Sequence, residues 1–242
     1  MTSLLGKTLL VSGAGSGIGR ASARLLSGRG AGLVLLGRRL EALRETLPEA
    51  MHVALDHADD AAVQAFAERC PPLDGILLAA GELLTGSVEG STAQLFERMI
   101  AANLRGPWLL CHHLGPRIKD GGSVVLVGSN IGLRAIPESA AYSVAKAGVH
   151  MLAKVLALEW APRKIRCNAI APGPVHTAMV ETRLHASADP VGDLQKLAKV
   201  NPLGRLGEER EIALLASHLL SDESGWTTGT VIPIDGGASG AF

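Results

Sequence analysis

Aromatic residues are the scarcest class in this 242-residue chain, with three phenylalanines, three tryptophans and one tyrosine. Chemistry that needs a phenol therefore has a single candidate, Tyr142. Cysteine is scarce as well. Cys70, Cys111 and Cys167 are far apart and odd in number, which argues against a disulfide framework and a cysteine-rich metal site. Free thiols are typical of a reducing compartment, so we expect the protein to be cytoplasmic.

Neither charge sign is in excess, because 23 basic residues balance 23 acidic ones. The closest basic groupings, Arg38-Arg39 and residues 163–166, are too short to follow a phosphate backbone, so no nucleic-acid partner is expected. No apolar run reaches the roughly 18 residues of a membrane span, and residues 1–11 lack the pattern of a signal peptide, so no membrane partner is expected. The histidines lack ligand-like spacing, and we expect no metal site.

Apolar residues make up 47% of the chain, which is enough for one domain, residues 1–242, with a large core. Short apolar runs alternate with helix-length stretches, and this alternation predicts an α/β fold: a single-domain, doubly wound (Rossmann) parallel sheet of about seven strands flanked by helices. The predicted strands are residues 8–12, 33–36, 51–55, 75–80, 123–128, 165–170 and 230–234. The predicted helical stretches are residues 18–26, 40–47, 59–69, 91–118, 139–160 and 208–220.

One long stretch, residues 172–201, has no clear periodicity. It carries Pro174, Pro190 and Gly192 among many small or polar residues, so we interpret it as irregular. Long loops inside compact domains are often active-site lids. We therefore predict a substrate lid at about residues 174–201.

A glycine-rich turn follows the first predicted strand: Ser12-Gly13-Ala14-Gly15-Ser16-Gly17-Ile18-Gly19. At this place backbone amides and the dipole of the following helix can face a phosphate. The pattern is Gly-x-x-x-Gly-x-Gly, which is neither a Walker loop nor Gly-x-Gly-x-x-Gly. A turn that serves packing alone is the alternative, but the position directly after the first strand favours phosphate binding.

The second predicted strand ends in Leu36-Gly37-Arg38-Arg39. In dinucleotide-binding units an acidic residue near this position holds the ribose hydroxyls of NAD, whereas an arginine accommodates the 2′-phosphate of NADP. No carboxylate is available here, and two guanidinium groups can pair with a phosphate. The alternative is that both arginines only begin a solvated helix. We therefore expect NADP(H) as the preferred cofactor and keep NAD(H) as the alternative.

Tyr142 and Lys146 are four positions apart in a predicted helix, so both side chains emerge on one face. An ammonium near a phenol lowers its pKa from about 10 toward the range useful for proton transfer. Ser129 follows the predicted strand 123–128, where doubly wound sheets place ligands, and its hydroxyl can hold a substrate carbonyl. Capping of a turn or helix is the alternative role for Ser129.

In this combination the sequence resembles the short-chain dehydrogenase/reductase family from Lys7 to Gly237. The resemblance implies a hydride transfer between a nicotinamide and a carbonyl carbon, with Tyr142 as general acid or base. Ser129 would hold the carbonyl oxygen, Lys146 would lower the pKa of Tyr142 and hold the nicotinamide ribose, and Asn103 would support a water that leads protons outward. The cofactor-binding residues that the resemblance implies are Gly13, Ser16, Gly17, Ile18, Gly19, Arg38, Arg39, Asp56, Gly81, Tyr142, Lys146, Pro172, Gly173, Val175 and Thr177.

Two of these positions have a second interpretation, and one motif departs from the family. Asp56 matches a position that contacts the adenine and Thr177 one that contacts the nicotinamide carboxamide, but either can instead cap a helix. Where the family usually has Asn-Asn-Ala-Gly after the fourth strand, this chain has Leu78-Ala79-Ala80-Gly81. Without those amides we expect a looser strand end, while Gly81 keeps the close approach to the cofactor ribose.

Residues expected near the carbonyl are mostly apolar, which favours an aliphatic or ring framework, with ordinary core packing as the alternative for some of them. Arg134 and Glu138 could contact a polar group, but a solvated loop is the simpler interpretation. The predicted helix 141–160 is apolar nearly all round, which favours a homo-oligomer, a tetramer or dimer. The candidate pocket residues are Leu83, Leu84, Ile131, Leu133, Ile136, Met179 and Val180.

These features predict an NADP(H)-dependent oxidoreductase that acts on a small-molecule carbonyl or secondary alcohol, in the manner of a carbonyl or 3-oxoacyl reductase. A non-catalytic dinucleotide-binding sensor or scaffold is one alternative, although binding alone needs no activated phenol. An epimerase or lyase on the same fold is the other. Net consumption of NADPH separates a reductase from that second alternative.

Overall fold

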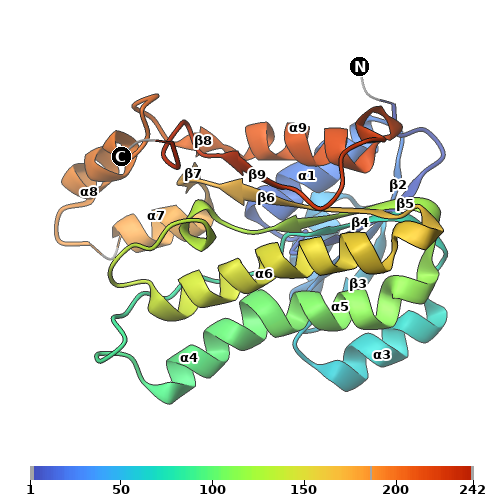
Figure 1. The fold of residues 1–242 in the computed structure, drawn as a ribbon, viewed down its shortest axis with the longest axis horizontal. Helices are drawn as coiled ribbons and strands as arrows, with labels where there is room; N and C mark the ends of the chain where they lie inside the picture. Colours follow the sequence, from blue (N-terminus) through green and yellow to red (C-terminus); the bar gives the residue numbers. More distant parts are fainter. Residues whose placement is uncertain (1–2, 186, 241–242) are drawn as a thin grey trace.

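The computed structural model describes residues 3–185 and 187–240 and is built around a parallel sheet (Figure 1). Seven strands lie in the order β3-β2-β1-β4-β5-β6-β9, and all neighbours are parallel. The predicted doubly wound α/β fold is therefore confirmed. The strands are β1 (Thr8–Ser12), β2 (Gly32–Gly37), β3 (Met51–Ala54), β4 (Leu73–Leu78), β5 (Ile118–Val127), β6 (Arg166–Pro172) and β9 (Val231–Ile234).

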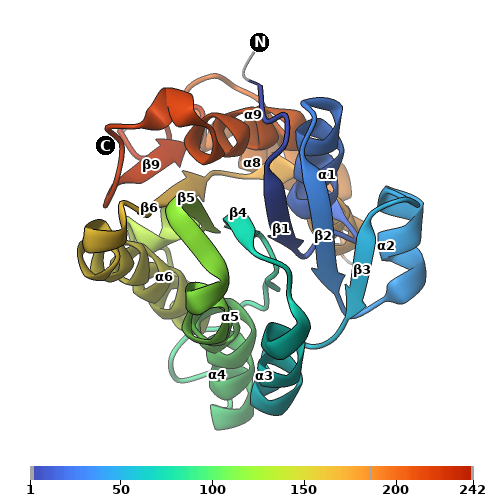
Figure 2. The same cartoon turned by 90° about the vertical axis from the view of Figure 1, so that its right-hand side faces the viewer.

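Helices cover both faces of the sheet (Figure 2). One face carries α1 (Gly17–Gly28), α2 (Leu40–Thr46) and α9 (Glu209–Leu220), and the other carries α3 (Asp60–Arg69), α4 (Ala93–Ile100), α5 (Gly106–Leu114) and α6 (Ala140–Glu159). Successive strand residues point to opposite faces, so two apolar cores form. In β1, Leu9 and Val11 pack toward α1 and α9, while Leu10 packs toward α3, α5 and α6.

The helical stretch predicted at residues 91–118 contains an irregular segment in its middle. Between α4 and α5 the chain forms η1 (Ala101–Arg105), a π-helix, and only Asn103 within it is buried. Such segments are rare and occur frequently at functional sites. The stretch also ends earlier than predicted, because β5 begins at Ile118 rather than at residue 123.

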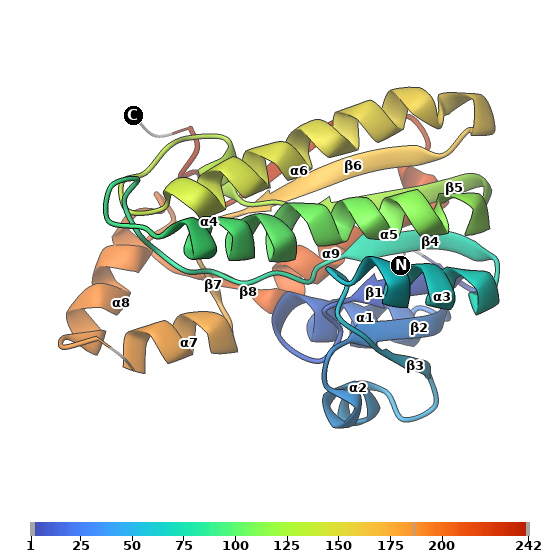
Figure 3. The same ribbon diagram turned by 90° about the horizontal axis from the view of Figure 1, so that it is seen from below.

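Residues 172–201 are not irregular, and that expectation was wrong. A short strand, β7 (Val175–His176), pairs with β8 (Gly207–Glu208), and two helices follow β7, α7 (Ala178–His185) and α8 (Pro190–Lys199). Pro190 occupies the first position of α8, where a missing N–H costs nothing, and Asp189 caps the helix by accepting from Gly192 N at 2.9 Å. Seen from below, α7 and α8 lie beyond the end of the sheet (Figure 3).

Within the described ranges, no helix has the length and hydrophobicity needed to cross a membrane. The three cysteines are all buried as free thiols. Residues 3–185 and 187–240 bring together no group of three or more His, Cys, Asp or Glu side chains that could hold a metal ion.

Candidate active site

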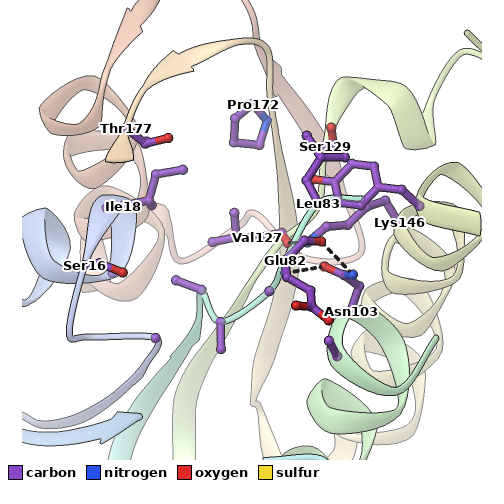
Figure 4. Close-up of a pocket in the computed structure, with 18 of the residues that line it drawn as sticks. Ser16, Ile18, Glu82, Leu83, Asn103, Val127, Ser129, Lys146, Pro172 and Thr177 are labelled. Carbon is purple, nitrogen blue, oxygen red and sulfur yellow. Dashed lines mark hydrogen bonds between the residues drawn. The ribbon is translucent and has the colours of Figure 1, made fainter. Parts of the chain in front are cut away.

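A cavity of about 670 Å³ opens at the carboxyl ends of the parallel strands. It lies where the strand order reverses between β1 and β4, which is the place where doubly wound sheets bind ligands. Every residue predicted to bind the cofactor or to take part in catalysis lines this one cavity. Figure 4 shows its two sides, with Ser16, Ile18 and Thr177 opposite Ser129, Lys146 and Asn103.

The glycine-rich turn brings backbone to the cavity wall because side chains are excluded from it. Gly13 has φ +69°, and a Cβ added there would lie 2.7 Å from the Ala80 backbone. A Cβ on Gly19 would lie 2.2 Å from the carbonyl oxygen of Gly13. The first turn of α1 has no side-chain cap from Ser16, so its backbone N–H groups stay available to an anion.

The end of β4 is tied down by a residue outside the departing motif. Ser12 Oγ accepts hydrogen bonds from the backbone N–H of Ala79 at 3.1 Å and of Ala80 at 3.2 Å. The looser strand end expected from the loss of the family's asparagines is therefore opposed by a hydroxyl at the end of the neighbouring strand. Ser12 itself is buried, which strengthens the two bonds by excluding water.

At the far end of the cavity two cations follow β2. Arg38 and Arg39 are exposed, and neither guanidinium makes a hydrogen bond or ion pair with the residues that the structure describes. The next arginine, Arg44, is instead paired with Glu41 at 2.8 Å. No acidic residue follows β2 at Arg38 and Arg39, and these two free guanidinium groups suit a phosphate.

Asp56 does not cap the helix that follows it. Its Oδ1 accepts from Ala58 N at 2.9 Å, and the cap of α3 is Asp59. The buried His57 lines the cavity beside Asp56 and was missed from the sequence, although it follows β3 as Asp56 does. Burial lowers the pKa of His57, opposed by the nearby Asp56 carboxylate, so the ring is neutral near pH 7.

Asn103 is fully buried and fixes the chain after β4 (Figure 4). Its Oδ1 accepts from Glu82 N at 3.2 Å, and its Nδ2 donates to Glu82 O at 2.9 Å and to Met99 O at 3.1 Å. The carboxamide therefore holds Glu82 in both directions. A Cβ on Gly81 would lie 2.6 Å from Asn103 Oδ1, which explains the glycine at that position.

Ser129, Tyr142 and Lys146 converge on the cavity from β5 and α6. Lys146 is buried, donates to the carbonyl oxygen of Val127 at 2.9 Å, and lies 5.6 Å from the centre of the Tyr142 ring. Ser129 also caps the short helix η3 (Asn130–Gly132), where its Oγ accepts from Ile131 N at 3.4 Å. The capping interpretation of Ser129 therefore applies, and the same residue also lines the cavity.

The pKa values of Tyr142 and Lys146 differ from those expected from the sequence. Burial raises the pKa of Tyr142 to about 12, and the hydrogen bond from Ser129 opposes that rise. Burial also lowers the pKa of Lys146 to about 8. In the protein alone, desolvation therefore outweighs the depression of the phenol pKa that the lysine was expected to cause. Each group is biased toward its neutral form.

His150, one turn after Lys146, lies behind Ser129 and was not singled out from the sequence. Its Nε2 accepts from the backbone N–H of Ser129 at 3.4 Å. Burial lowers the pKa of His150 to about 4, so the imidazole is neutral and can accept this bond. The ring fills the space left by two glycines, since a Cβ on Gly128 would lie 2.1 Å from its Nε2 and one on Gly132 would lie 2.7 Å from its Cε1.

The strand β9 reaches the same turn through the residue that follows it. Asn130 Nδ2 donates to Asp235 Oδ2 at 3.4 Å. A Cβ on Gly173 would lie 2.7 Å from Asp235 Cβ, so the Pro172-Gly173 segment packs directly on this aspartate. Asp235 is held in turn by Ser239, whose backbone N donates to Oδ2 at 2.8 Å.

The remaining wall is lined by the expected apolar residues only in part. Leu83, Ile131, Ile136 and Val180 line the cavity, and Leu84 and Leu133 do not; the side chain of Met179 lies outside the described part of the chain. Arg134 lines the cavity and Glu138 does not. Leu197 and Val200, at the end of α8, were missed because that segment was taken as irregular. Thr177 both lines the cavity and caps α7, accepting from Val180 N at 3.4 Å.

Known proteins share this fold and sequence along nearly the whole chain. A family model described as enoyl-(acyl carrier protein) reductase matches residues 13–239. Levodione reductase of Leifsonia aquatica is 36% identical, over 98% of this chain and 95% of its own length. The crystal structure of levodione reductase superposes with a TM-score of 0.91 at 36% identity, and the match covers 98% of this chain and 99% of that chain. The crystal structure of a short chain dehydrogenase family protein from Francisella tularensis superposes with a TM-score of 0.90 at 27% identity, and the match covers 97% of this chain and 99% of that chain.

The chain belongs to the short-chain dehydrogenase/reductase family. It is accordingly an oxidoreductase that acts on CH–OH or C=O groups with a nicotinamide dinucleotide. Another relative, 2-keto-3-deoxy-L-fuconate dehydrogenase of Xanthomonas campestris, is 34% identical over 98% of this chain and 82% of its own length. The turn from Gly13 to Gly19, called the glycine cradle below, fits the dinucleotide expected of a short-chain dehydrogenase/reductase. Gly13 and Gly19 leave backbone exposed to a phosphate, and the unpaired Arg38 and Arg39 stand at the far end of the cavity.

Proposed function

We propose that this chain is an NADP(H)-dependent reductase of a small-molecule carbonyl, or in reverse a dehydrogenase of a secondary alcohol. The observation that carries the proposal is the convergence of Ser129, Tyr142 and Lys146 on the cavity that the glycine cradle also lines. A binding module has no use for a phenol and a buried lysine at that point. The names of two relatives point to different substrates, levodione and 2-keto-3-deoxy-L-fuconate, so the substrate is argued separately below.

In this mechanism the bound dinucleotide supplies or accepts the hydride. Ser129 Oγ donates a hydrogen bond to the carbonyl oxygen, and the Tyr142 hydroxyl transfers its proton to that oxygen as negative charge develops there. Because burial raises the pKa of Tyr142 to about 12, the phenol is protonated near neutral pH, which suits carbonyl reduction. Lys146 holds the nicotinamide ribose and lies below the Tyr142 ring.

Asn103 has a supporting role in this proposal. Its carboxamide is hydrogen-bonded to Glu82 and Met99, so it fixes the chain that follows β4. One acceptor site on Oδ1 is left for a water that passes protons from Lys146 outward.

The preference for NADP(H) rests on Arg38 and Arg39. Both are exposed at the end of β2, and no acidic residue takes the position after that strand that would hold ribose hydroxyls. Asp56, Gly81 and Thr177 complete the cofactor contacts, at the adenine, the ribose and the nicotinamide carboxamide in that order.

Three further expectations belong to the same proposal. Residues 174–201 act as a lid, formed by the exposed helices α7 and α8 rather than by a loop. The chain forms a homo-oligomer through α6, whose outer face exposes Val144 (54%), Met151 (58%) and Leu158 (79%) at helical spacing. The protein works in the cytoplasm, where its three buried thiols stay reduced.

The test begins with titration of the protein with NADPH and NADH, followed by cofactor fluorescence. NADPH is expected to bind more tightly, and a panel of ketones is then expected to consume NADPH in step with alcohol formation. If neither dinucleotide binds, the protein is not a reductase and the scaffold alternative takes its place. Binding with isomerised product but no net NADPH consumption would assign the protein to the epimerase or lyase class.

A further inference from the structure

Among the described residues, Arg134 is a third unpaired cation of the cavity, besides Arg38 and Arg39 at the end of β2, whereas the other two cations that line it, Arg98 and Lys146, have partners. Arg98 donates from Nε and Nη2 to both oxygens of Glu82, at 2.7 and 2.8 Å, so that charge is neutralised. Lys146 donates to the carbonyl oxygen of Val127. Arg134 Nε is buried without a hydrogen-bond partner, and within residues 3–185 and 187–240 no carboxylate pairs with its guanidinium.

The position of Arg134 is fixed by the turn that carries Ser129. Gly132 N donates to Ser129 O at 3.0 Å, and Arg134 N donates to Asn130 O at 3.1 Å, so the chain makes two tight turns between Ser129 and Arg134. The turn packs on α6, where a Cβ on Gly132 would lie 2.8 Å from the carbonyl carbon of Lys146. The backbone of Arg134 is therefore fixed relative to Ser129 and Lys146.

Arg134 lines a cavity whose wall is in part apolar. The apolar side chains of that wall include Leu83, Ile131, Ile136 and Val180. Arg134 Nε is buried without an acceptor, and the half-buried side chain as a whole lines the cavity, where a ligand can supply an acceptor to its guanidinium. The acidic residues that line the cavity do not serve, because Glu82 is already paired with Arg98 and Asp56 follows β3 at the cofactor end.

We propose that the substrate is an oxo acid, or in reverse its hydroxy acid, whose carboxylate is bound by Arg134. A guanidinium presents parallel donors that match a carboxylate, and a carboxylate carries the single negative charge that one arginine balances. The apolar walls bind the carbon chain between the carboxylate and the carbonyl. This inference rests on the proposed function, since it names the substrate class for the same carbonyl site.

The first experiment measures binding and needs no turnover. In the presence of saturating NADPH, the affinities of butanoate and hexanoate are compared with those of butanamide and hexanamide by calorimetry. The carboxylates are expected to bind at least tenfold more tightly than the amides. Arg134→Gln should remove that preference and leave NADPH affinity unchanged, whereas Arg134→Lys should keep part of it. Equal binding of acids and amides to the unaltered protein overturns the proposal.

The second experiment measures kcat/KM for 2-, 3- and 4-oxo acids against their methyl esters. The unaltered enzyme should favour at least one acid by tenfold or more, and Arg134→Gln should abolish this preference while still reducing the esters. Equal reduction of acids and esters overturns the substrate assignment and leaves the proposed function standing. Absence of NADPH consumption with every compound counts against the proposed function instead, while the binding experiment still decides the role of Arg134.

Arg69→Gln serves as the matched control. Arg69 is exposed at the end of α3, next to the amino ends of the strands and away from the cavity. Arg69→Gln removes the same charge from the molecule as Arg134→Gln. A loss of acid preference in Arg69→Gln would mean that the net charge of the protein causes the preference, and would overturn the role of Arg134.

Discussion

The two ends of the cavity are built on opposite principles. The cofactor end is made of backbone: Gly13 and Gly19 stand where a Cβ would overlap main-chain atoms, at 2.7 and 2.2 Å. The substrate end is made of side chains, from the turn after Ser129 and from the short helices α7 and α8. At the first end the fold dictates the residues. At the second end, the buried Lys146 and the unpaired Arg134 cost stability, and the proposed binding of cofactor and substrate accounts for their presence.

The sharpest test of the substrate end is Tyr142→Phe. Loss of the only phenol at the site should lower kcat by about 10³-fold, because proton transfer to the carbonyl oxygen is lost. The fold and the glycine cradle are untouched, so NADPH affinity should change by less than about threefold. Steady-state kinetics with cofactor titration measure both. Retained turnover would mean that another group donates the proton.

At the cofactor end the largest effect is expected from Gly19→Ala. The new methyl group would overlap the carbonyl of Gly13, so the turn must shift, at a cost of about 3 kcal/mol in the free energy of unfolding, and NADPH affinity should fall with it. Gly28→Ala in the same helix is the control. No atom lies within 4 Å of the added Cβ there, so this variant should be neutral or slightly more stable. Urea unfolding compares the two, and equal stabilities would contradict a backbone-defined cradle.

At the substrate end, Lys146→Met should raise the free energy of unfolding, whereas Gly19→Ala lowers it. Burial lowers the pKa of Lys146 from 10.5 to about 8, so keeping it charged in the folded protein costs about 3 kcal/mol. Removing the lysine recovers this cost but loses the hydrogen bond to Val127, which contributes about 1 kcal/mol. Between pH 8 and 10.5 the unfolded chain binds more protons than the folded one, so the stability of the unaltered protein rises with pH in that window. The variant, without cofactor, should be about 2 kcal/mol more stable at pH 7.

Most of the advantage of Lys146→Met should disappear by about pH 10.5, because Lys146 is then neutral in the folded protein and half deprotonated in the unfolded chain. Denaturant unfolding at pH 7, 9 and 10.5 provides the measurement. A variant that is less stable at pH 7, or a difference independent of pH, would show that the lysine supports the fold rather than straining it.

The smallest effect is expected from Arg38→Ala. Removal of an exposed cation should weaken NADPH binding about tenfold, about 1.4 kcal/mol, and leave NADH binding unchanged. Arg44→Ala provides the control, because Arg44 is paired with Glu41 on the following helix. Fluorescence titration at two salt concentrations measures both, and a parallel loss for NADPH and NADH would remove Arg38 from the 2′-phosphate site.

The same contrast explains what could be predicted from the sequence. The seven strands of the sheet and the cradle from Gly13 to Gly19 were predictable, since apolar runs and glycines report backbone geometry directly. The helices α7 and α8 were not, because Pro190 and Gly192 were counted among the signs of an irregular stretch, whereas they belong to the first turn of a capped helix. That Arg134 lines the cavity could not be predicted either, since the tight turn after Ser129 that carries it follows no periodicity.

The contact between Asp235 and Asn130 has a consequence for biosynthesis. Asp235 follows the strand β9, which comes last in the chain yet pairs with β6 beside the catalytic turn. On the ribosome, the segments carrying Ser129 and Tyr142 emerge long before β9 can join the sheet. The turn that carries Ser129 therefore gains its hydrogen bond to Asp235 only when synthesis is nearly finished, and a prematurely terminated chain would lack both the edge strand and this bond.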